Sequence, residues 1–303
     1  MPRFAGVFFI RYTTHMPHLH DEKVKQLELV ANRLRQHVIR MVQTAGSGHQ
    51  GGPLGMADIF ALLYFHELRH KPKQPLWPDR DRFLLSSGHT CPIRYAAMAE
   101  AGYFPVKELA TLRKFGSRLQ GHPERSKLLA LETTSGPLGE GLAQGAGMAY
   151  AAKMDKKTWR VFVMTSDGEH AAGLHWEAMM FAGKNRLDNL ICIVDRNNIQ
   201  IDGDTEDIMP LEPLRAKYEA FNWHVIDCAG NHIPALHNAF QEARQVRQKP
   251  ICILAHTIPG YGVSFMENDY HWHSQPFKDH EAEKALAELK EIETQLKQEH
   301  AKK

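Results

Sequence analysis

Hydrophobic positions along the chain alternate between two patterns. Short apolar runs, such as 161–165, 190–194 and 251–255, are separated by longer stretches in which apolar residues recur every three or four positions. The runs have the length of strands and the longer stretches have the spacing of helices. A run, a helical stretch and a second run in succession are typical of a βαβ unit. The sequence therefore predicts an α/β fold, a doubly wound parallel sheet with helices on both faces.

The pattern also predicts the limits of the elements. Helices are expected at 21–45, 55–68, 141–153, 174–185, 233–246 and 278–301, and strands at 82–86, 161–165, 190–194, 223–228 and 251–255. The glycine-rich segment 46–53 should end the first helix, because so many glycines do not extend a helix and instead allow close backbone approach to a ligand. Residues 1–20 are expected to form a disordered leader, 21–277 the main domain, and 278–303 a solvated terminal helix.

Oxygen-bearing side chains follow two neighbouring strands. Asp167 comes after the run 161–165, and Asn197 follows the next run. Because parallel strands end at the same edge of a sheet, these side chains should lie close together, at the edge where open α/β sheets bind ligands. A carboxylate, an amide oxygen and the backbone carbonyl of Ile199 would suit Mg²⁺ or Ca²⁺ shared with a bound phosphate. Gly168 would admit a diphosphate, and the following helix N-terminus favours an anion. In isolation, this pattern more often marks a helix cap and a turn.

Histidines recur in the predicted loops. His49 lies in the glycine-rich segment, His89 follows the strand at 82–86, and His122 lies in a later loop. His271 and His273 fall in the long loop 256–275. A single histidine in such a loop is more often a turn residue than a catalyst, so these positions gain meaning only together.

Composition excludes several classes of protein. The chain has 303 residues, a net charge of +2 and no basic block, so nucleic acid is not an expected partner. No apolar run approaches the roughly 18 residues of a membrane helix, and no secretory signal is evident. The four cysteines are far apart, which favours buried thiols over disulfides. We therefore expect a cytoplasmic protein.

The spacing of Asp167-Gly168, Glu177, Asn197-Asn198 and Asp202-Gly203 resembles the thiamine diphosphate motif of the transketolase family. The resemblance covers residues 22–280, with further motifs in family order. It implies that residues 21–277 form a diphosphate-binding domain for thiamine diphosphate and Mg²⁺, with Ca²⁺ or Mn²⁺ as substitutes. The implied metal ligands are Asp167, Asn197 and Ile199.

The resemblance also assigns roles to other residues. It implies that His49, His122 and His273 are catalytic. The cofactor contacts that it implies are His89, Gly136, Pro137, Leu138, Gly168, Glu177, Asn197 and His273. The implied reaction transfers a two-carbon ketol unit from a ketose phosphate to an aldose phosphate, and histidine accepts the proton of the C3 hydroxyl.

The sequence departs from the family pattern at several positions. Gln50 stands where proline is usual, and Gln275 stands where lysine is common, so one positive contact to the diphosphate or substrate is missing. Ala172 replaces a glutamate that faces the neighbouring subunit, which should weaken communication between paired sites. His271 is the alternative to His273 as the site histidine.

Full-length members of the family also carry a pyrimidine domain, which this sequence does not contain. We therefore expect the N-terminal subunit of a split transketolase, which pairs with a separate C-terminal subunit carrying the pyrimidine domain in an α2β2 heterotetramer. The alternatives are a 1-deoxyxylulose-5-phosphate synthase, the alpha subunit of a 2-oxo acid dehydrogenase, and a non-catalytic cofactor-binding scaffold. The histidines in the loops at 49 and 122 favour transketolase, and a scaffold needs no row of histidines.

Overall fold

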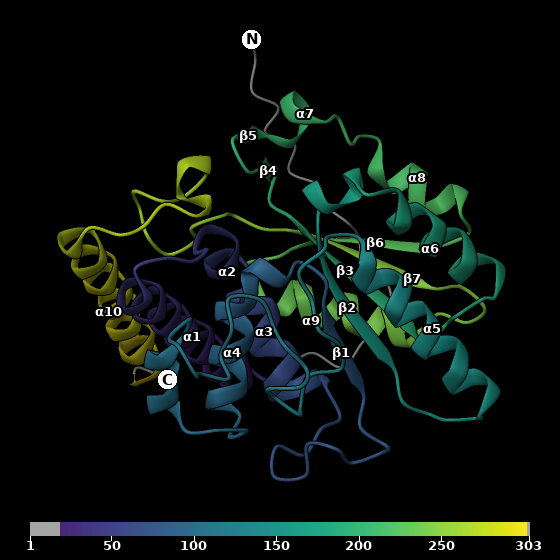
Figure 1. The fold of residues 1–303 in the computed structure, drawn as a ribbon, viewed down its shortest axis with the longest axis horizontal. Helices are drawn as coiled ribbons and strands as arrows, with labels where there is room; N and C mark the ends of the chain where they lie inside the picture. The colour runs from purple at the N-terminus through teal and green to yellow at the C-terminus, as the bar shows by residue number, and fades with distance from the viewer. Residues whose placement is uncertain (1–18, 302–303) are drawn as a thin grey trace.

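The computed structural model describes residues 19–301 and is built around a five-stranded parallel sheet in the order β1-β2-β3-β7-β6 (Figure 1). The strands are β1 (Arg82–Leu85), β2 (Val161–Ser166), β3 (Leu190–Arg196), β6 (His224–Ala229) and β7 (Ile251–His256). Because all five strands are parallel, their carboxyl ends lie at one edge. The predicted α/β architecture is confirmed.

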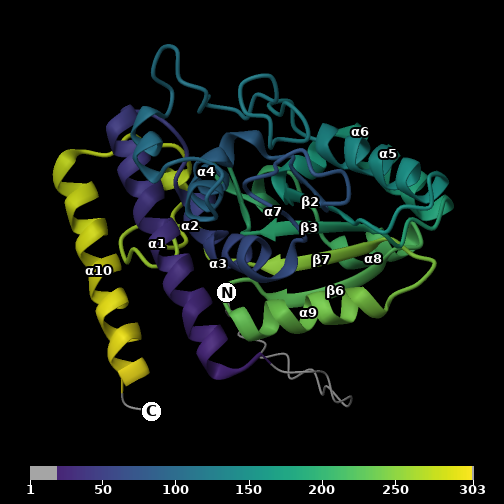
Figure 2. The same ribbon diagram turned by 90° about the horizontal axis from the view of Figure 1, so that it is seen from below.

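Helices cover both faces of this sheet. One face is packed by α1 (Asp21–Ala45), α3 (Ala57–Leu62), α4 (Cys91–Glu100) and α9 (Ile233–Gln245). The other face is packed by α5 (Glu140–Met154), α6 (Gly173–Lys184) and α8 (Leu214–Ala220). Figure 2 shows α9 on one side of the sheet and α5 and α6 on the other, and in both views α10 (Asp279–Ala301) lies beside α1.

Alternation along each strand divides the interior into two hydrophobic cores. In β2, Phe162 and Met164 belong to the core on the α1 and α9 side. Val161 and Val163 belong to the core under α5 and α6. Successive strand side chains point to opposite faces, and both faces are covered, so β2, β3 and β7 are apolar over most of their length. This double burial explains why the strands could be recognised as short continuous runs.

The predicted helix at 55–68 is wrong in detail. The chain is already helical at α2 (Gly51–Gly55), breaks at Met56, continues as α3, and ends as a π-helix, η1 (Leu63–Glu67). The glycines of α2 allow close packing within a helix: a Cβ on Gly51 would lie 3.1 Å from the carbonyl oxygen of Trp272, and a Cβ on Gly55 would lie 2.7 Å from that of Ile258. Residues 51–55 therefore form a glycine-rich helix that packs closely against other backbone, and not a loop.

Several short elements complete the described chain. These are the 3-10 helices η2 (Gly88–Thr90), η3 (Val106–Thr111), η4 (Gly168–Ala171) and η5 (Tyr270–His273), the hairpin of β4 (Ile199–Gln200) and β5 (Gly203–Asp204), and α7 (Thr205–Ile208). The sequence did not predict the hairpin, α7 or α8. All four cysteines are buried and free, as expected.

The limits of the described chain affect two expectations. The predicted leader, apart from Leu19 and His20, lies outside the described residues, as do 302–303 of the predicted terminal helix. Within residues 19–301, no helix combines the length and apolar composition needed to cross a bilayer.

Candidate functional site

A cleft of about 290 Å³ opens at the carboxyl ends of β1, β2 and β3. Segments far apart in the sequence line it. The lining residues are His49, Gly52, Pro53, His89, Thr90, His122, Gly136, Leu138, Ser166, Gly168, Glu169, Asp195, Asn197, Ile199, Gln200, Ile201 and His273. The cleft is therefore the place where the loops predicted to carry chemistry meet.

Three imidazole rings are grouped at one side of the cleft. The ring centroids of His49 and His89 are 4.7 Å apart, and those of His49 and His273 are 5.1 Å apart. His89 and His273 complete the triangle at 5.4 Å. His122 lines the same cleft, and its ring lies 3.9 Å from where a Cβ on Gly136 would stand. The structure thus brings together four of the histidines singled out in the sequence.

Burial keeps these imidazoles uncharged at neutral pH. Burial lowers the pKa of His49 and of His89 to about 3, and the neighbouring imidazoles add a smaller effect in the same direction. Burial also lowers the pKa of His122 and of His273. A neutral imidazole carries one N–H donor and one acceptor nitrogen, so each ring can both donate and accept a hydrogen bond with a bound molecule.

Asp167 holds the loop after β2 against the loop after β3. Its Oδ1 accepts a hydrogen bond from the backbone N–H of Gly168 at 2.8 Å. Its Oδ2 accepts from the backbone N–H of Asn198 at 2.7 Å and from the Arg196 guanidinium at 3.0 Å. Burial raises the pKa of Asp167, and Arg196 opposes that shift. The two loops therefore lie together, as the parallel strand order predicted.

Asn197 is oriented by a buried acid that the sequence did not single out. Its Nδ2 donates to Asp195 Oδ2 at 2.8 Å, and its Oδ1 accepts from the backbone N–H of Ile199 at 2.9 Å. Thr257, directly after β7, donates to the other oxygen of Asp195. Burial raises the pKa of Asp195 to about 7. Asp195 thus fixes the orientation of the Asn197 side chain. A carboxylate within an otherwise apolar strand was the sequence feature that could have indicated this role of Asp195.

Glu169, in the wall of the cleft, connects three segments of the chain. It is buried, and its Oε1 accepts from the hydroxyl of Ser86 and from the backbone N–H of Gly139 at 2.6 Å. Its Oε2 accepts from the backbone N–H of Ser166 at 3.2 Å. Sequence reasoning assigned no role to Glu169, because its partners Ser86 and Gly139 lie far away in the chain.

A buried hydrogen-bond network supports the loop that follows β2. His170 Nδ1 lies 2.9 Å from the carbonyl oxygen of Ser166 and 3.1 Å from that of Asp167. Its Nε2 lies 2.9 Å from the Tyr218 hydroxyl, which also lies 2.8 Å from His175 Nε2. Burial lowers the pKa of His170 to about 4, so the ring is neutral. The network holds the backbone on which Asp167 sits.

The structure brings most, but not all, of the predicted site residues to the cleft. The predicted residues that line it are His49, His89, His122, Gly136, Leu138, Gly168, Asn197, Ile199 and His273. Pro137, Asp167 and Glu177 are not among them. The side chain of Asp167 is buried behind the cleft wall, where Arg196 contacts it. Glu177 is exposed, because the helical period directs Ala178 and Met179 of α6 toward the sheet and turns Glu177 away.

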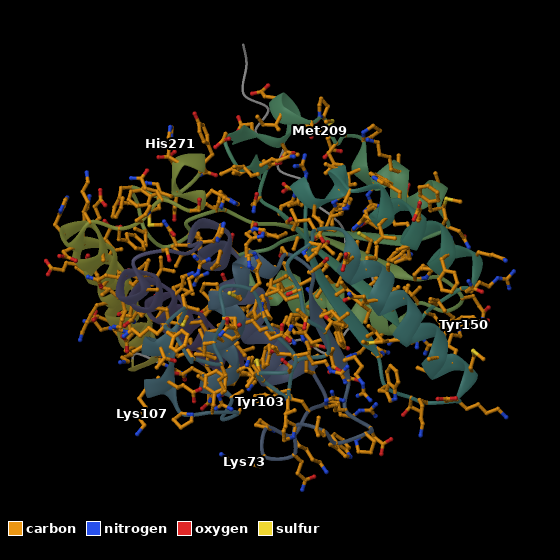
Figure 3. The ribbon with its side chains drawn as sticks, viewed as in Figure 1. Lys73, Tyr103, Lys107, Tyr150, Met209 and His271 are labelled. Atoms are coloured by element: carbon orange, nitrogen blue, oxygen red, sulfur yellow. The ribbon has the colours of Figure 1, made fainter. Side chains whose placement is uncertain are left out.

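His273, rather than His271, faces the cleft. The side chain of His271 is 63% exposed and lies 2.7 Å from Asp269, and Figure 3 shows it at the periphery of the molecule. Gln50 and Gln275, two departures from the family pattern, contact each other: the Gln50 amide donates to the carbonyl of Gln275. This bond fastens the segment of His49 to the segment of His273.

Comparison with known proteins places this geometry in a family. Residues 26–293 match the family described as "Transketolase, thiamine diphosphate binding domain". The chain is 39% identical over 269 residues to the 6-deoxy-6-sulfo-D-fructose transketolase subunit SqwG of Clostridium sp. (strain MSTE9), and the match covers 89% of this chain and 98% of that one. It is 36% identical to an apulose-4-phosphate transketolase subunit from Phocaeicola vulgatus, and here the match covers 92% and 99%.

Complete transketolases match over part of their length. The chain is 39% identical to the transketolase of Rattus norvegicus, and the match covers 89% of this chain and 43% of the rat protein. The crystal structure of transketolase from Campylobacter jejuni superimposes with a TM-score of 0.82 at 34% identity, over 87% of this chain and 42% of that one. The chain therefore belongs to the transketolase family, through its thiamine diphosphate-binding domain.

Proposed function

We propose that this chain is the diphosphate-binding subunit of a two-chain transketolase. In this proposal it binds thiamine diphosphate and Mg²⁺ and transfers a two-carbon ketol unit between sugar phosphates. A separate subunit supplies the pyrimidine domain, in an α2β2 assembly. The observation that carries the proposal is the group of four neutral histidines facing the same cleft as Gly168 and Asn197.

The relatives support the two-chain arrangement. Both subunit-named relatives are matched over nearly their whole length, at 98% and 99%, whereas the rat transketolase is matched over 43%. The relatives also favour transketolase over a 1-deoxyxylulose-5-phosphate synthase, a 2-oxo acid dehydrogenase subunit or a scaffold, since all four proteins compared carry transketolase names.

The cleft fits the cofactor in shape and chemistry. Gly52, Gly136 and Gly168 line it without side chains, which leaves room for a diphosphate near the backbone. Leu138 and Ile201 add apolar surface for a ring. The neutral imidazoles offer hydrogen bonds to the diphosphate and the substrate. When bound, thiamine diphosphate supplies an electron sink for the two-carbon unit.

Oxygen atoms suited to Mg²⁺ are present in the wall of the cleft and directly behind it. Asn197 and Ile199 line the cleft, and Asp167 Oδ1 accepts one hydrogen bond, from Gly168, so it keeps a lone pair. The other oxygen, Oδ2, is occupied by donors that include Arg196. Asp167 would therefore bind Mg²⁺ through a single oxygen, together with Asn197 and the Ile199 carbonyl.

The histidines supply proton transfer. His49 and His273 are proposed to accept the proton of the substrate C3 hydroxyl, because both are neutral at pH 7 and therefore carry a free nitrogen lone pair. His122, which lines the same cleft, is proposed to orient the two-carbon unit and to take part in the same proton transfer. His89, more deeply buried, is proposed to hold the cofactor.

The test is reconstitution of activity. The chain is assayed alone and with the pyrimidine-domain subunit from the same organism, with thiamine diphosphate and Mg²⁺. The donors to be offered are xylulose 5-phosphate, apulose 4-phosphate and 6-deoxy-6-sulfo-D-fructose. We expect ketol transfer only from the pair, and a loss of about 100- to 10,000-fold in kcat for His49→Ala or His122→Ala.

Two controls make this test decisive. His271→Ala changes an exposed histidine two positions before His273 and should keep full activity in the pair. Calorimetry on the pair should detect Mg²⁺-dependent binding of thiamine diphosphate that Asp167→Ala weakens. Turnover by the chain alone, or near-normal rates in both histidine variants, would contradict the proposal.

A further inference from the structure

A second group of ligand-type side chains lies at the opposite edge of the sheet from the cleft. His66 and Glu67 end η1, and His237 lies on α9. A small cavity borders Glu67 together with Asp81 and Arg160, which directly precede β1 and β2. Glu67 is therefore near the amino ends of the strands, whereas the cleft lies at their carboxyl ends. No role in the proposed ketol transfer involves this group.

The three donor atoms converge. Glu67 Oε1 lies 3.7 Å from His66 Nε2 and 3.6 Å from His237 Nδ1. All three ligand atoms lie within 4.8 Å of one another. A zinc ion with ligands at about 2.0–2.2 Å in a tetrahedron sets neighbouring ligand atoms about 3.4 Å apart. Two of the three observed separations are therefore close to those of a zinc site.

The carboxylate of Glu67 is buried and oriented. Its side chain is 1% exposed, and among the described residues its Oε1 accepts no hydrogen bond. Arg244 of α9 contacts the other oxygen, Oε2, and so turns Oε1 toward the two imidazoles. A buried carboxylate oxygen without a hydrogen-bond donor is unusual and calls for a partner such as an ion.

Local backbone geometry sets up this convergence. In η1 the backbone N–H of Leu68 donates to the carbonyl of Leu63 at 2.9 Å, a π-type bond that widens the last turn. Such π-helical turns occur frequently at functional sites. His237 and Arg244 are seven residues apart on α9, about two turns, and therefore share the face directed at Glu67.

We infer that His66 Nε2, Glu67 Oε1 and His237 Nδ1 form a site for a transition metal ion of the zinc class. Three protein ligands leave a fourth position for water, which can enter because the His66 side chain is 28% exposed. Two imidazoles beside one carboxylate whose charge Arg244 balances suit zinc, cobalt or nickel. They do not suit Mg²⁺, which prefers several oxygen ligands. A bound ion would fasten the end of η1 to α9.

The test uses the full chain stripped of metal with a chelator and titrated with Co²⁺. We expect one equivalent of Co²⁺ to give the visible absorption of a four-coordinate site, Zn²⁺ to displace it, and excess Mg²⁺ to leave it unchanged. His66→Ala, a change at a partly exposed position, should weaken Co²⁺ binding at least 100-fold. Glu67→Gln, if the variant folds, should also weaken Co²⁺ binding at least 100-fold.

Matched histidine variants locate the ion. His224 pairs with Glu242 at 2.8 Å, and His89 lies in the cleft. His224→Ala and His89→Ala should both keep the cobalt absorption. Zn²⁺ should raise the Tm of the wild-type chain and leave that of His66→Ala unchanged. Absence of the absorption in the wild type, its survival in His66→Ala, or its loss in His89→Ala would each overturn the inference.

Discussion

Arg196, the last residue of β3, places its guanidinium Nη1 3.0 Å from the carboxylate Oδ2 of Asp167, the residue directly after β2. The Arg196 side chain is 4% exposed and that of Asp167 is fully buried. The other guanidinium nitrogen, Nη2, contacts Glu206 and Glu212 on the surface side. Arg196 therefore balances a buried charge at the proposed metal site and connects it to the segment after the β4–β5 hairpin.

Replacing Arg196 with glutamine should destabilise the chain by about 3 kcal/mol in urea unfolding at pH 7.5. The loss is large because the variant leaves Asp167 buried without its counter-charge, and buried pairs broken on one side typically cost about 3–5 kcal/mol. If Asp167 also binds Mg²⁺, then thiamine diphosphate with Mg²⁺ should recover part of this loss, because the ion supplies positive charge to the same carboxylate.

Arg215→Gln is the matched control for this experiment. Arg215 also pairs with two acids, Asp227 and Glu219, but its side chain is 46% exposed. Solvent screens exposed pairs, so this change should cost less than about 1 kcal/mol. Equal losses in the two arginine variants would show that Asp167 does not depend on Arg196.

Glu169→Gln should lower the free energy of unfolding by about 1–3 kcal/mol. Both oxygens of the carboxylate accept hydrogen bonds, from Gly139, Ser86 and Ser166. A glutamine amide places an N–H₂ donor against one of these donors, which leaves a buried group unsatisfied. Glu177→Gln, at an exposed position on α6, is the control and should stay within about 0.5 kcal/mol of wild type. A stability in Glu169→Gln indistinguishable from that control would rule out this role.

The sequence predicted the sheet well, because its strands can be recognised from the local pattern of apolar residues. The strands β2, β3 and β7 are buried on both faces of the sheet, so they appear as apolar runs. The helices α1, α6 and α9 begin and end within about one residue of the predicted limits, since the spacing of apolar residues changes at the ends of each helix. The helical α2 was missed, because its glycines are suited to close contact with backbone that lies more than 200 residues later in the chain, at Ile258 and Trp272.

The functional site likewise contains some contacts that the sequence predicted and others that it did not. The meeting of Asp167 with the Asn197 loop follows from parallel neighbouring strands alone, which is a local inference. The contact of the His49 and His273 rings joins segments 224 positions apart, and only the family resemblance indicated it. The partners of Glu169 left no sequence pattern, because a hydrogen bond between distant loops imposes no spacing.

Gly145→Ala should destabilise the chain by about 1–3 kcal/mol, although alanine favours helix more than glycine does. Gly145 lies on the buried side of α5, and a Cβ there would stand 2.4 Å from Cγ2 of Val163 in β2. Gly147→Ala on the same helix meets no atom within 4 Å and should instead stabilise by about 0.5–1 kcal/mol. Opposite signs in urea unfolding are expected, and a gain in both variants would show that α5 and β2 are not tightly packed.

His89 should make the cofactor-free chain lose stability as the pH falls below about 6.5. In the unfolded chain His89 has a pKa near 6.5, whereas burial lowers the pKa of His89 to about 3 in the folded chain. Between these values the unfolded state binds a proton that the folded state does not, so acid favours unfolding. One such proton changes the free energy of unfolding by at most about 1.4 kcal/mol per pH unit.

His89→Gln removes this titration while keeping a polar side chain in the cleft. Urea unfolding at pH 5.0, 6.0, 7.5 and 8.5 should therefore give a smaller decline below pH 6.5 for the variant than for the wild type. Between pH 7.5 and 8.5 the two slopes should agree, because His89 is neutral in both the folded and the unfolded chain. His49 lies 4.7 Å away and its pKa is lowered in the same way, so a residual decline should persist in the single variant and shrink further in His49→Gln/His89→Gln. Parallel curves for wild type and double variant below pH 6.5 would mean that the folded cleft accepts protons as readily as the unfolded chain, and the neutral-imidazole basis of the proposed proton transfer would then be lost.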